Sequence, residues 1–247
     1  MKDVPGDYYE RLASVDDRHW WARGLVEIEG TLLAPWLDRG PRAILDAGCG
    51  TGAFLAWAAR RVPGASLAGI DLSPDAISVA RRRVPTAALH VGPLTALPFE
   101  TASFDVITLN DVLQHVDEDR VAESLAELRR VLDPRGVLAV RTNGARRGRR
   151  ERQDWRLYEP SSLQAHLQQG GFVVRRMTYA NLFFSLVAEL RGRGPRAPTG
   201  TTCGIPSQPG AFASMLGRAA LGLETAVVGV NGRIPWGHTL LAVAVPR

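Results

Sequence analysis

The sequence predicts an α/β fold, with one doubly wound open sheet and helices on both faces. Short apolar runs that suit buried strands alternate with stretches of helical periodicity along most of the chain. The first run, residues 43–45, is followed by an acid and then by a glycine-rich loop that opens a helix. The second run, residues 66–71, also ends in an acid. Because ligands of such sheets bind at the carboxyl ends of the strands, these features also predict where a binding site lies.

Length and composition indicate a single domain over residues 1–247. A chain of 247 residues with a net charge of +5 can bury a sizeable core on its own. No amino-terminal stretch resembles a secretion signal, and no apolar run reaches the roughly 18 residues of a membrane span, so we expect neither. Cys49 and Cys203 form no disulfide or metal-binding pattern. We therefore expect a cytoplasmic protein without a bound metal.

The glycine loop is the most informative part of the chain. Residues 44–52 read Ile-Leu-Asp-Ala-Gly-Cys-Gly-Thr-Gly, and the alternating glycines let the backbone pass close to a ligand. Gly48, Gly50 and Ala53 formally satisfy the G-x-G-x-x-G/A fingerprint of dinucleotide sites. Asp46 disfavours that interpretation, because a carboxylate beside the loop would repel a pyrophosphate. The acid suits a zwitterion that carries an ammonium and a sulfonium group.

An acid followed by G-x-G-x-G resembles the first motif of the class I S-adenosylmethionine-dependent methyltransferases. The resemblance runs in consecutive order over residues 40–180. It implies a Rossmann-like, seven-stranded mixed sheet of order 3-2-1-4-5-7-6 with a reversed last strand. It also implies S-adenosylmethionine as cofactor and S-adenosylhomocysteine as product. The loop residues expected to hold the cofactor are Asp46, Gly48, Cys49, Gly50 and Gly52.

The second acid, Asp71, lies 19 positions after Gly52 at the end of the second predicted strand. Its carboxylate can accept hydrogen bonds from both ribose hydroxyls of an adenosine. The resemblance implies that Leu72 then lies against the adenine face. The alternative is that Asp71 only caps the following helix. We favour ribose binding, because Ser73 already fits the cap with Pro74 at the first helical position.

The third strand motif, residues 90–99, departs from the family at Pro93. An acid usually stands there and receives the adenine amino group. Without it the adenine edge must be read by the backbone around Leu94 or by Thr95, and the residues do not select between these. We expect Pro93 and Leu94 to line the cofactor. Residues 97–99 fit core packing and a turn.

The fourth strand, residues 104–110, is expected to meet the methionine part of the cofactor, and residues 111–116 to start the next helix. Asn110 and Asp111 are therefore candidates for the methyl-transfer site, although helix capping fits Asp111 equally well. His115 can deprotonate an acceptor, yet a structural hydrogen bond explains it better. The fifth strand is predicted at residues 137–140 and the sixth at 172–179.

The amino-terminal residues 1–40 are expected to form a helical lid, since residues 7–36 are rich in aromatic side chains. The spacing Tyr-Tyr…His-Trp-Trp-x-Arg looks like the leading helices of small-molecule methyltransferases, which shield the transfer site from water. We expect Tyr9 and Trp21, with His19 beside them, near the cofactor or acceptor. The alternative is an aromatic stripe on the core, which explains Trp36 and one of the paired tryptophans. His115, Asp111 and His19 are the catalytic candidates.

A long connection precedes the last strand at residues 238–245. The cofactor-binding core is expected at residues 41–180. The long connection after it, residues 181–235, is expected to form a cap, and residues 236–247 are expected to add the last strand to the sheet. Two apolar helices are predicted at 181–191 and 211–230, with a Gly/Pro/Thr-rich separator between them. The cap fits a cover over the acceptor, a dimer surface or a contact with a lipid-linked acceptor. Arg218 and Glu224 argue against a bilayer crossing.

The expected function is methyl transfer to an oxygen or nitrogen of a small molecule in bacterial specialised metabolism, such as antibiotic or glycoside synthesis. An RNA methyltransferase is the first alternative, because arginines cluster at residues 81–83 and 146–152. Neither cluster is interleaved with stacking aromatics, which disfavours a nucleic-acid partner. A non-catalytic protein that binds the cofactor is the second alternative, suggested by Pro93. Monomer and homodimer both remain open.

Overall fold

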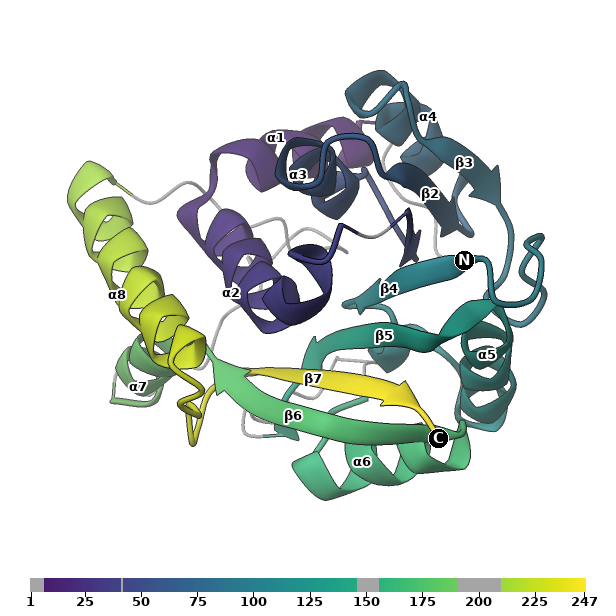
Figure 1. Cartoon of the computed structure of the whole chain (residues 1–247). Helices are drawn as coiled ribbons and strands as arrows, with labels where there is room; N and C mark the ends of the chain where they lie inside the picture. The colour runs from purple at the N-terminus through teal and green to yellow at the C-terminus, as the bar shows by residue number, and fades with distance from the viewer. Residues whose placement is uncertain (1–6, 41, 146–155, 191–209) are drawn as a thin grey trace.

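The computed structural model describes residues 7–40, 42–145, 156–190 and 210–247, with the side chains of 188–190 excepted. Seven strands form one sheet of order β3-β2-β1-β4-β5-β7-β6, which confirms the predicted order (Figure 1). The strands are β1 Ala43–Ala47, β2 Ser66–Asp71, β3 Ala88–Val91, β4 Phe104–Asn110, β5 Leu132–Asn143, β6 Phe172–Ala180 and β7 Thr239–Pro246. β7 runs antiparallel to both of its neighbours, and the pairs among β1 to β5 are parallel.

Helices cover both faces of the sheet, as the alternating pattern predicts (Figure 1). The described helices are α1 Tyr8–Arg18, α2 Trp20–Leu37, α3 Ala53–Arg61, α4 Pro74–Arg83, the 3-10 turn η1 Leu113–His115, α5 Glu118–Val131, α6 Pro160–Gln169, α7 Leu182–Leu190 and α8 Ala211–Gly229. Helices α1 to α4 lie on one side and α5 and α6 on the other. The core joins fully buried side chains of α2, such as Leu25 and Ile28, to strand residues such as Ile44 and Ile107.

The prediction that the next helix starts within residues 111–116 is wrong. Asp111 has a left-handed backbone with φ 57°, and its N–H donates to the carbonyl oxygen of Arg141 at 2.9 Å. This conformation cannot continue into an α-helix, so only the turn η1 forms before α5 begins at Glu118. β5 also begins earlier than residue 137, because Leu132 pairs with Phe104 before the register shifts.

The two apolar helices of the cap are confirmed as α7 and α8. The separator predicted at 192–210 lies outside the described residues, except for Gly210. Helix α8 lies along α2 (Figure 1). Glycines permit this close contact. A Cβ on Gly217 would come within 2.5 Å of the Trp20 ring, and a Cβ on Gly24 within 2.4 Å of Leu221. The cap therefore rests directly on the amino-terminal helices.

Glu224, a charged residue within an apolar helix, has a structural role. Its Oε2 accepts the backbone N–H of Asn181 at 2.7 Å, and the amides of Leu182 and Phe183 also stabilise its charge at the start of α7. Burial raises the pKa of Glu224, and these amides oppose the rise. By length and composition α8 is the single described helix that could span a membrane, and 22% of that stretch is buried.

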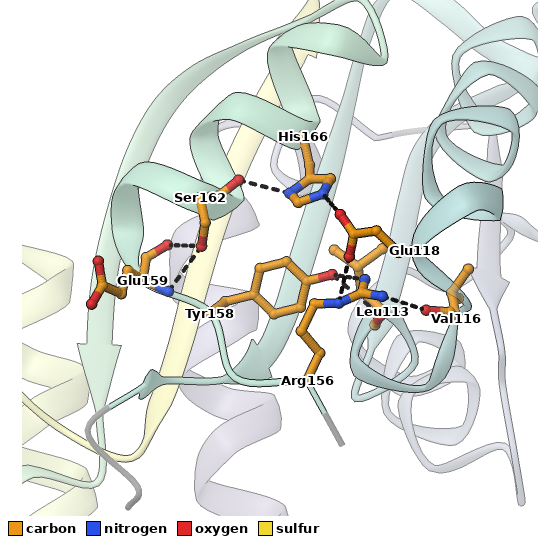
Figure 2. Close-up of polar contacts among 8 residues, drawn as sticks. All are labelled: Leu113, Val116, Glu118, Arg156, Tyr158, Glu159, Ser162 and His166. Carbon is orange, nitrogen blue, oxygen red and sulfur yellow. Dashed lines mark hydrogen bonds and ion pairs between the residues drawn. The ribbon is translucent and has the colours of Figure 1, made fainter. Parts of the chain in front are cut away.

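A polar network fixes the chain where it re-enters the described part at Arg156 (Figure 2). The Arg156 guanidinium contacts Glu118 and Tyr158, each at 2.8 Å, and donates to the carbonyl oxygen of Val116 at 3.1 Å. Glu118 also contacts His166 at 2.8 Å. This network joins α5, α6 and the end of η1, so it fixes the turn that carries His115. The basic cluster predicted at 146–152 lies outside the described residues.

Candidate functional site

The glycine loop turns sharply between β1 and α3. Gly48, Gly50 and Gly52 all have left-handed backbones, with φ of 76°, 50° and 79°. The N–H groups of Gly48 and Cys49 donate to the carbonyl oxygen of Ile70 at 2.7 and 3.0 Å. The loop is therefore tied to β2, at the carboxyl edge of the sheet.

The three glycines meet different surroundings. A Cβ on Gly48 would come within 2.2 Å of Val112, and one on Gly52 within 3.3 Å of Ala80. A Cβ on Gly50 would meet no atom within 4 Å. Gly48 and Gly52 thus allow close packing within the protein, whereas Gly50 borders open space on the side where a ligand can lie.

Asp71 is held in place by the backbone. Its Oδ2 accepts the N–H of Gly50 and its Oδ1 the N–H of Ser73, both at 2.9 Å. Ser73 is the cap of α4, as predicted, because its Oγ accepts the N–H of Ala76 at 3.2 Å. Each Asp71 oxygen accepts one of these bonds, and a carboxylate oxygen can accept more than one. The carboxylate is therefore oriented beside the glycine loop with capacity for ribose hydroxyls.

Apolar side chains stand exposed next to Asp71. Leu72 is 63% exposed and Val91, the register partner of Asp71 on β3, is 51% exposed. Exposed apolar groups at the carboxyl edge of a sheet offer a surface for a flat ring. Pro93 is exposed close by, and Leu94 is buried. The Thr95 hydroxyl accepts a bond from Arg120 at 3.4 Å.

Asp46 lies at the end of β1 and is buried. Its Oδ1 accepts the hydroxyl of Thr108, its register partner on β4, at 2.8 Å. Burial raises the pKa of Asp46 to about 7, and the charge of Asp71 adds to the rise. The Thr108 hydrogen bond and the charge of Arg141 oppose it. A cation placed beside this carboxylate would be strongly stabilised.

A second charged group lies at the ends of β4 and β5. The Arg141 guanidinium pairs with Asp111 at 2.8 Å and lies 3.6 Å from Glu29 of α2. Burial raises the pKa of Glu29 to about 8, against the attraction of Arg141. Asn110, beside Asp111, has both amide atoms buried. The structure thus places two further charged residues, Glu29 and Arg141, near the candidates Asn110 and Asp111.

Hydrogen bonds and ion pairs connect helix α1 of the predicted lid to the glycine loop. The Thr51 hydroxyl donates to Asp16 at 2.6 Å, and Arg83 of α4 contacts Asp16, Asp17 and Thr51. Burial raises the pKa of Asp16, and the Thr51 hydrogen bond and nearby arginines oppose this. Two arginines of the predicted cluster, Arg82 and Arg83, are therefore paired with acids of α1.

The predicted lid residues occupy different positions. Tyr9 is half-buried on α1, with its ring 5.1 Å from that of Tyr8. Trp21 is half-buried and packs on the core, as does Trp36. His19 is buried, and its Nδ1 accepts the N–H of Trp21 at 3.2 Å, so it caps α2. Burial lowers the pKa of His19.

His115 stands on η1 at the same edge of the sheet and is exposed. The preceding residue, Gln114, is buried, and its Oε1 accepts the Thr142 hydroxyl at 2.9 Å. Desolvation by the surrounding protein lowers the pKa of His115, and the charge of Asp111 opposes this. The imidazole is therefore neutral near pH 7 and can accept a proton.

Sequence reasoning missed Glu29, Arg141 and Asp16. A signal existed for the first two, because each is a charge placed within an apolar run, residues 25–33 and 137–143. Charged side chains within apolar runs that form core elements are buried with partners or exposed to a ligand. Asp16 offered no signal, since acids are common on exposed helices.

Comparison with known proteins decides among the nucleotide-binding classes. Residues 45–140, which hold the glycine loop and both strand-end acids, match the model of a family described as a methyltransferase domain. This part of the chain is similar to the class I S-adenosylmethionine-dependent methyltransferases. The matched residues include the first strand, the glycine loop and the two strand-end acids, which are the features on which the sequence-based prediction of this family rests.

Two curated relatives and one solved structure resemble this chain. The demethylmenaquinone methyltransferase of Thermus thermophilus is 33% identical over 54% of this chain and 59% of that protein. An uncharacterized 37.1 kDa protein in transposon TN4556 of Streptomyces fradiae is 40% identical over 54% of this chain and 37% of that protein. The PH0226 protein of Pyrococcus horikoshii shares the fold, with a TM-score of 0.60, 16% identity and 91% of each chain covered. The matched part thus spans between 37% and 59% of the length of these curated relatives.

The residues present fit S-adenosylmethionine. An oriented carboxylate at Asp71 suits a ribose, and exposed Leu72 and Val91 suit an adenine ring. The buried acid Asp46 beside the loop suits a positively charged ligand. Within the described residues, no group of three or more His, Cys, Asp and Glu side chains is arranged to hold a metal ion.

Proposed function

We propose that this chain moves a methyl group from S-adenosylmethionine to an oxygen or nitrogen of a small, largely apolar molecule. The observation that carries the proposal is the loop itself: a Cβ on Gly50 would meet open space, and the Gly50 N–H donates to the Asp71 carboxylate. The buried acid Asp46 lies on the strand that leads into this loop. S-adenosylmethionine, when bound, supplies a methyl group on a sulfonium that leaves as a neutral thioether. Two acids and no cation on the loop favour this ligand over a pyrophosphate.

The chain's own residues bind and orient the cofactor and shield the transfer site from water. Asp71 holds the ribose, Leu72 and Val91 the adenine, and Asp46 favours positive charge at the adjacent strand end. Helices α1 and α2 cover this edge, because Asp16 of α1 accepts a hydrogen bond from Thr51 and Glu29 of α2 lies near Arg141 of β5. Water exclusion accelerates the transfer because positive charge is lost from the sulfonium. Holding the acceptor in line with the methyl group can supply roughly 7–11 kcal/mol.

Among the three catalytic candidates, His115 is the residue that we propose receives the acceptor proton. His115 is exposed on η1 at the carboxyl edge of the sheet, whereas His19 is buried. The lowered pKa of His115 keeps its imidazole neutral and thus able to accept a proton. An amine or phenolate acceptor would need little help of this kind.

The apolar character of the acceptor is inferred from the cap. Several large apolar side chains of α7, of α8 and of the residue that follows α8 are exposed: Phe183, Leu186, Phe212, Met215, Leu216, Leu223 and Val230. Such a surface suits contact with an apolar or lipid-linked acceptor. The name of the Thermus relative, which acts on demethylmenaquinone, supports an apolar acceptor of this kind. The large cap and aromatic lid support the organic acceptors of bacterial specialised metabolism.

The test combines binding with turnover. Calorimetry should detect binding of S-adenosylmethionine and of S-adenosylhomocysteine, and it should detect no binding of NAD or FAD. An assay with radiolabelled methyl donor should then label organic extracts of bacterial quinones, phenols and glycosides. The small-molecule proposal fails if the label enters only RNA or protein. The cofactor proposal fails if NAD or FAD binds and both sulfur nucleosides are ignored.

RNA methylation remains the second candidate because the chain is basic, with a net charge of +5. The pairing of Arg82 and Arg83 with acids of α1 counts against it. Polynucleotide binding that weakens steeply with salt, together with label in RNA, would favour this candidate.

A further inference from the structure

Helix α8 has an unusually apolar outer side. Its buried residues recur every three or four positions along the inner side: Gly217, Leu221, Glu224 and Val228. This inner side packs on α2. Apart from Arg218, every exposed residue of α8 is apolar or a glycine. A helix at the surface of a protein normally carries charged and polar residues on the side that faces water, so the outer side of α8 fits water poorly.

Large apolar side chains form one row along this outer side. The row consists of four residues that are between 41% and 81% exposed: Phe212, Leu216, Leu223 and Val230, which directly follows the helix. They are four and seven positions apart, which places them on the same side of a helix. We call these four residues the outer face. Figure 1 shows α8 at the margin of the molecule, where a partner can reach it. A continuous exposed apolar row of this kind marks an interaction site.

The charges around the outer face are positive. Arg218 is exposed on α8, and Arg233 is exposed just beyond its end. Neither arginine forms an ion pair in the part of the chain that the structure describes. Arg176 donates to two carbonyl oxygens at the carboxyl end of α8, and burial and the charge of Arg233 both lower the pKa of Arg176. Glu224, the one acid of α8, is buried on the inner side. This surface therefore attracts anions.

A second copy of this chain is a poor partner for the outer face. In a two-fold symmetric dimer the same surface meets itself. Arg218 and Arg233 of one copy would then lie close to the same arginines of the other copy. The outer side of α8 carries no acid to offset them, so the like charges would oppose such a dimer.

A protein partner also fits less well than a lipid bilayer. Protein interfaces form about one hydrogen bond per 100–200 Å². Arg218 is the single exposed residue of α8 whose side chain can form one. Hydrocarbon chains need no hydrogen bonds, and anionic headgroups attract arginines. The apolar row and the nearby arginines therefore match the boundary between headgroups and acyl chains.

We propose that the outer face, with Arg218 and Arg233 beside it, docks this chain on the surface of an anionic lipid bilayer. The inner side of α8 stays packed on α2, where a Cβ on Gly217 would come within 2.5 Å of the Trp20 ring. The helix therefore lies along the membrane surface and does not cross it. The inference goes beyond the proposed function and is independent of it, because docking on lipid does not depend on the reaction.

Flotation with vesicles tests the apolar part of the proposal. We expect the wild-type protein to float with vesicles of equal parts phosphatidylglycerol and phosphatidylcholine. A double variant, Phe212→Ser with Leu216→Ser, should bind these vesicles at least about 10-fold more weakly, because two large apolar side chains no longer enter the acyl boundary. Both side chains are exposed, so thermal unfolding of the double variant should match that of the wild type.

A second vesicle composition and a charge variant test the electrostatic part. Vesicles of phosphatidylcholine alone should bind the wild type several-fold more weakly than the mixed vesicles. Arg218→Gln should weaken binding to the mixed vesicles about 5-fold and leave binding to phosphatidylcholine unchanged. Arg135→Gln is the matched control, because Arg135 is exposed near the start of β5, whereas the cap joins the sheet beside the end of β5. It should change neither affinity.

Wild-type protein that floats with neither kind of vesicle would overturn the proposal, and so would equal flotation of the wild type and the double variant. Equal affinity for the two vesicle compositions would overturn the role of the arginines. A dimer that the double variant loses in analytical ultracentrifugation, without flotation of the wild type, would assign the outer face to a second copy. None of these results bears on the proposed methyl transfer, which calorimetry and methyl labelling test separately.

Discussion

Asp71 is a single carboxylate with two tasks. Its oxygens fix the Gly50 and Ser73 amides, and its remaining acceptor capacity faces the proposed ribose. Asp71→Asn removes the charge and replaces one acceptor by a donor. We expect both S-adenosylhomocysteine and methylthioadenosine to bind about 10- to 100-fold more weakly, measured by calorimetry. Asp75→Asn, on the exposed first turn of α4, is the control. Unchanged nucleoside affinity in Asp71→Asn would contradict ribose binding.

The buried acids Glu29 and Asp46 predict a pH dependence. Their folded-state pKa values of about 8 and about 7 lie above the ordinary values of 4.5 and 3.8. The folded protein therefore holds protons that the unfolded chain loses first. Their stabilisation is complete below about pH 4 and is lost as the pH rises through about 7 to 8. Chemical denaturation of the ligand-free protein should show a falling free energy of unfolding over this window. Glu29→Gln should flatten the fall, and an unchanged slope would contradict the assignment.

Residue positions were predictable where a local pattern determined them. The acids Asp46 and Asp71 come at the ends of apolar runs, and the Ser73-Pro74 pair is typical of a helix start. The sequence therefore predicts both strand ends and the start of the helix. Glu29 differs, because it stands within an apolar helix and its partner Arg141 lies on a strand far along the chain. Only the folded sheet brings the two together, and no local period encodes that contact.

At the scale of elements, two glycines of α8 make a matched pair. Gly217 packs beneath Trp20, whereas a Cβ added to Gly222 would meet no atom within 4 Å. Gly217→Ala should destabilise the fold by about 1–3 kcal/mol through overpacking against α2. Gly222→Ala should stabilise it by up to about 1 kcal/mol through helix propensity. Thermal or denaturant unfolding of the two variants measures both, and equal effects would contradict the described α2–α8 contact.

The elements themselves were mostly predictable, and the exceptions have tertiary causes. Strands and long helices follow from apolar periodicity, and the two cap helices were found by the same signal. Residues 111–116 read as helical, but the Asp111 backbone bonds to Arg141 on β5 and takes a left-handed form. Likewise, Asp133-Pro134-Arg135-Gly136 reads as a turn, yet Leu132 pairs with Phe104 and lengthens β5. Both departures depend on strand pairing that a local pattern does not contain.

At the scale of the whole molecule, the exposed apolar face of α8 should govern attachment to lipid surfaces. We expect the protein to sediment with phosphatidylglycerol vesicles, and Leu223→Glu to reduce the bound fraction several-fold by placing a charge on that face. Ser161→Glu, exposed on α6, makes the same change in charge and should have no effect. Wild-type protein that stays in solution would contradict lipid contact. Loss of a dimer in Leu223→Glu, measured by analytical ultracentrifugation, would assign the face to a second copy.

The order of the strands has a further consequence for how such enzymes diversify. Ala180 at the end of β6 pairs directly with Thr239 at the start of β7, so residues 181–238 leave and rejoin the sheet at one place. An insertion with coincident ends can be lengthened, shortened or exchanged while the hydrogen-bonded ladder on either side keeps its register. New acceptor preferences can therefore arise by grafting this excursion, provided that the graft still offers a small residue where it meets Trp20.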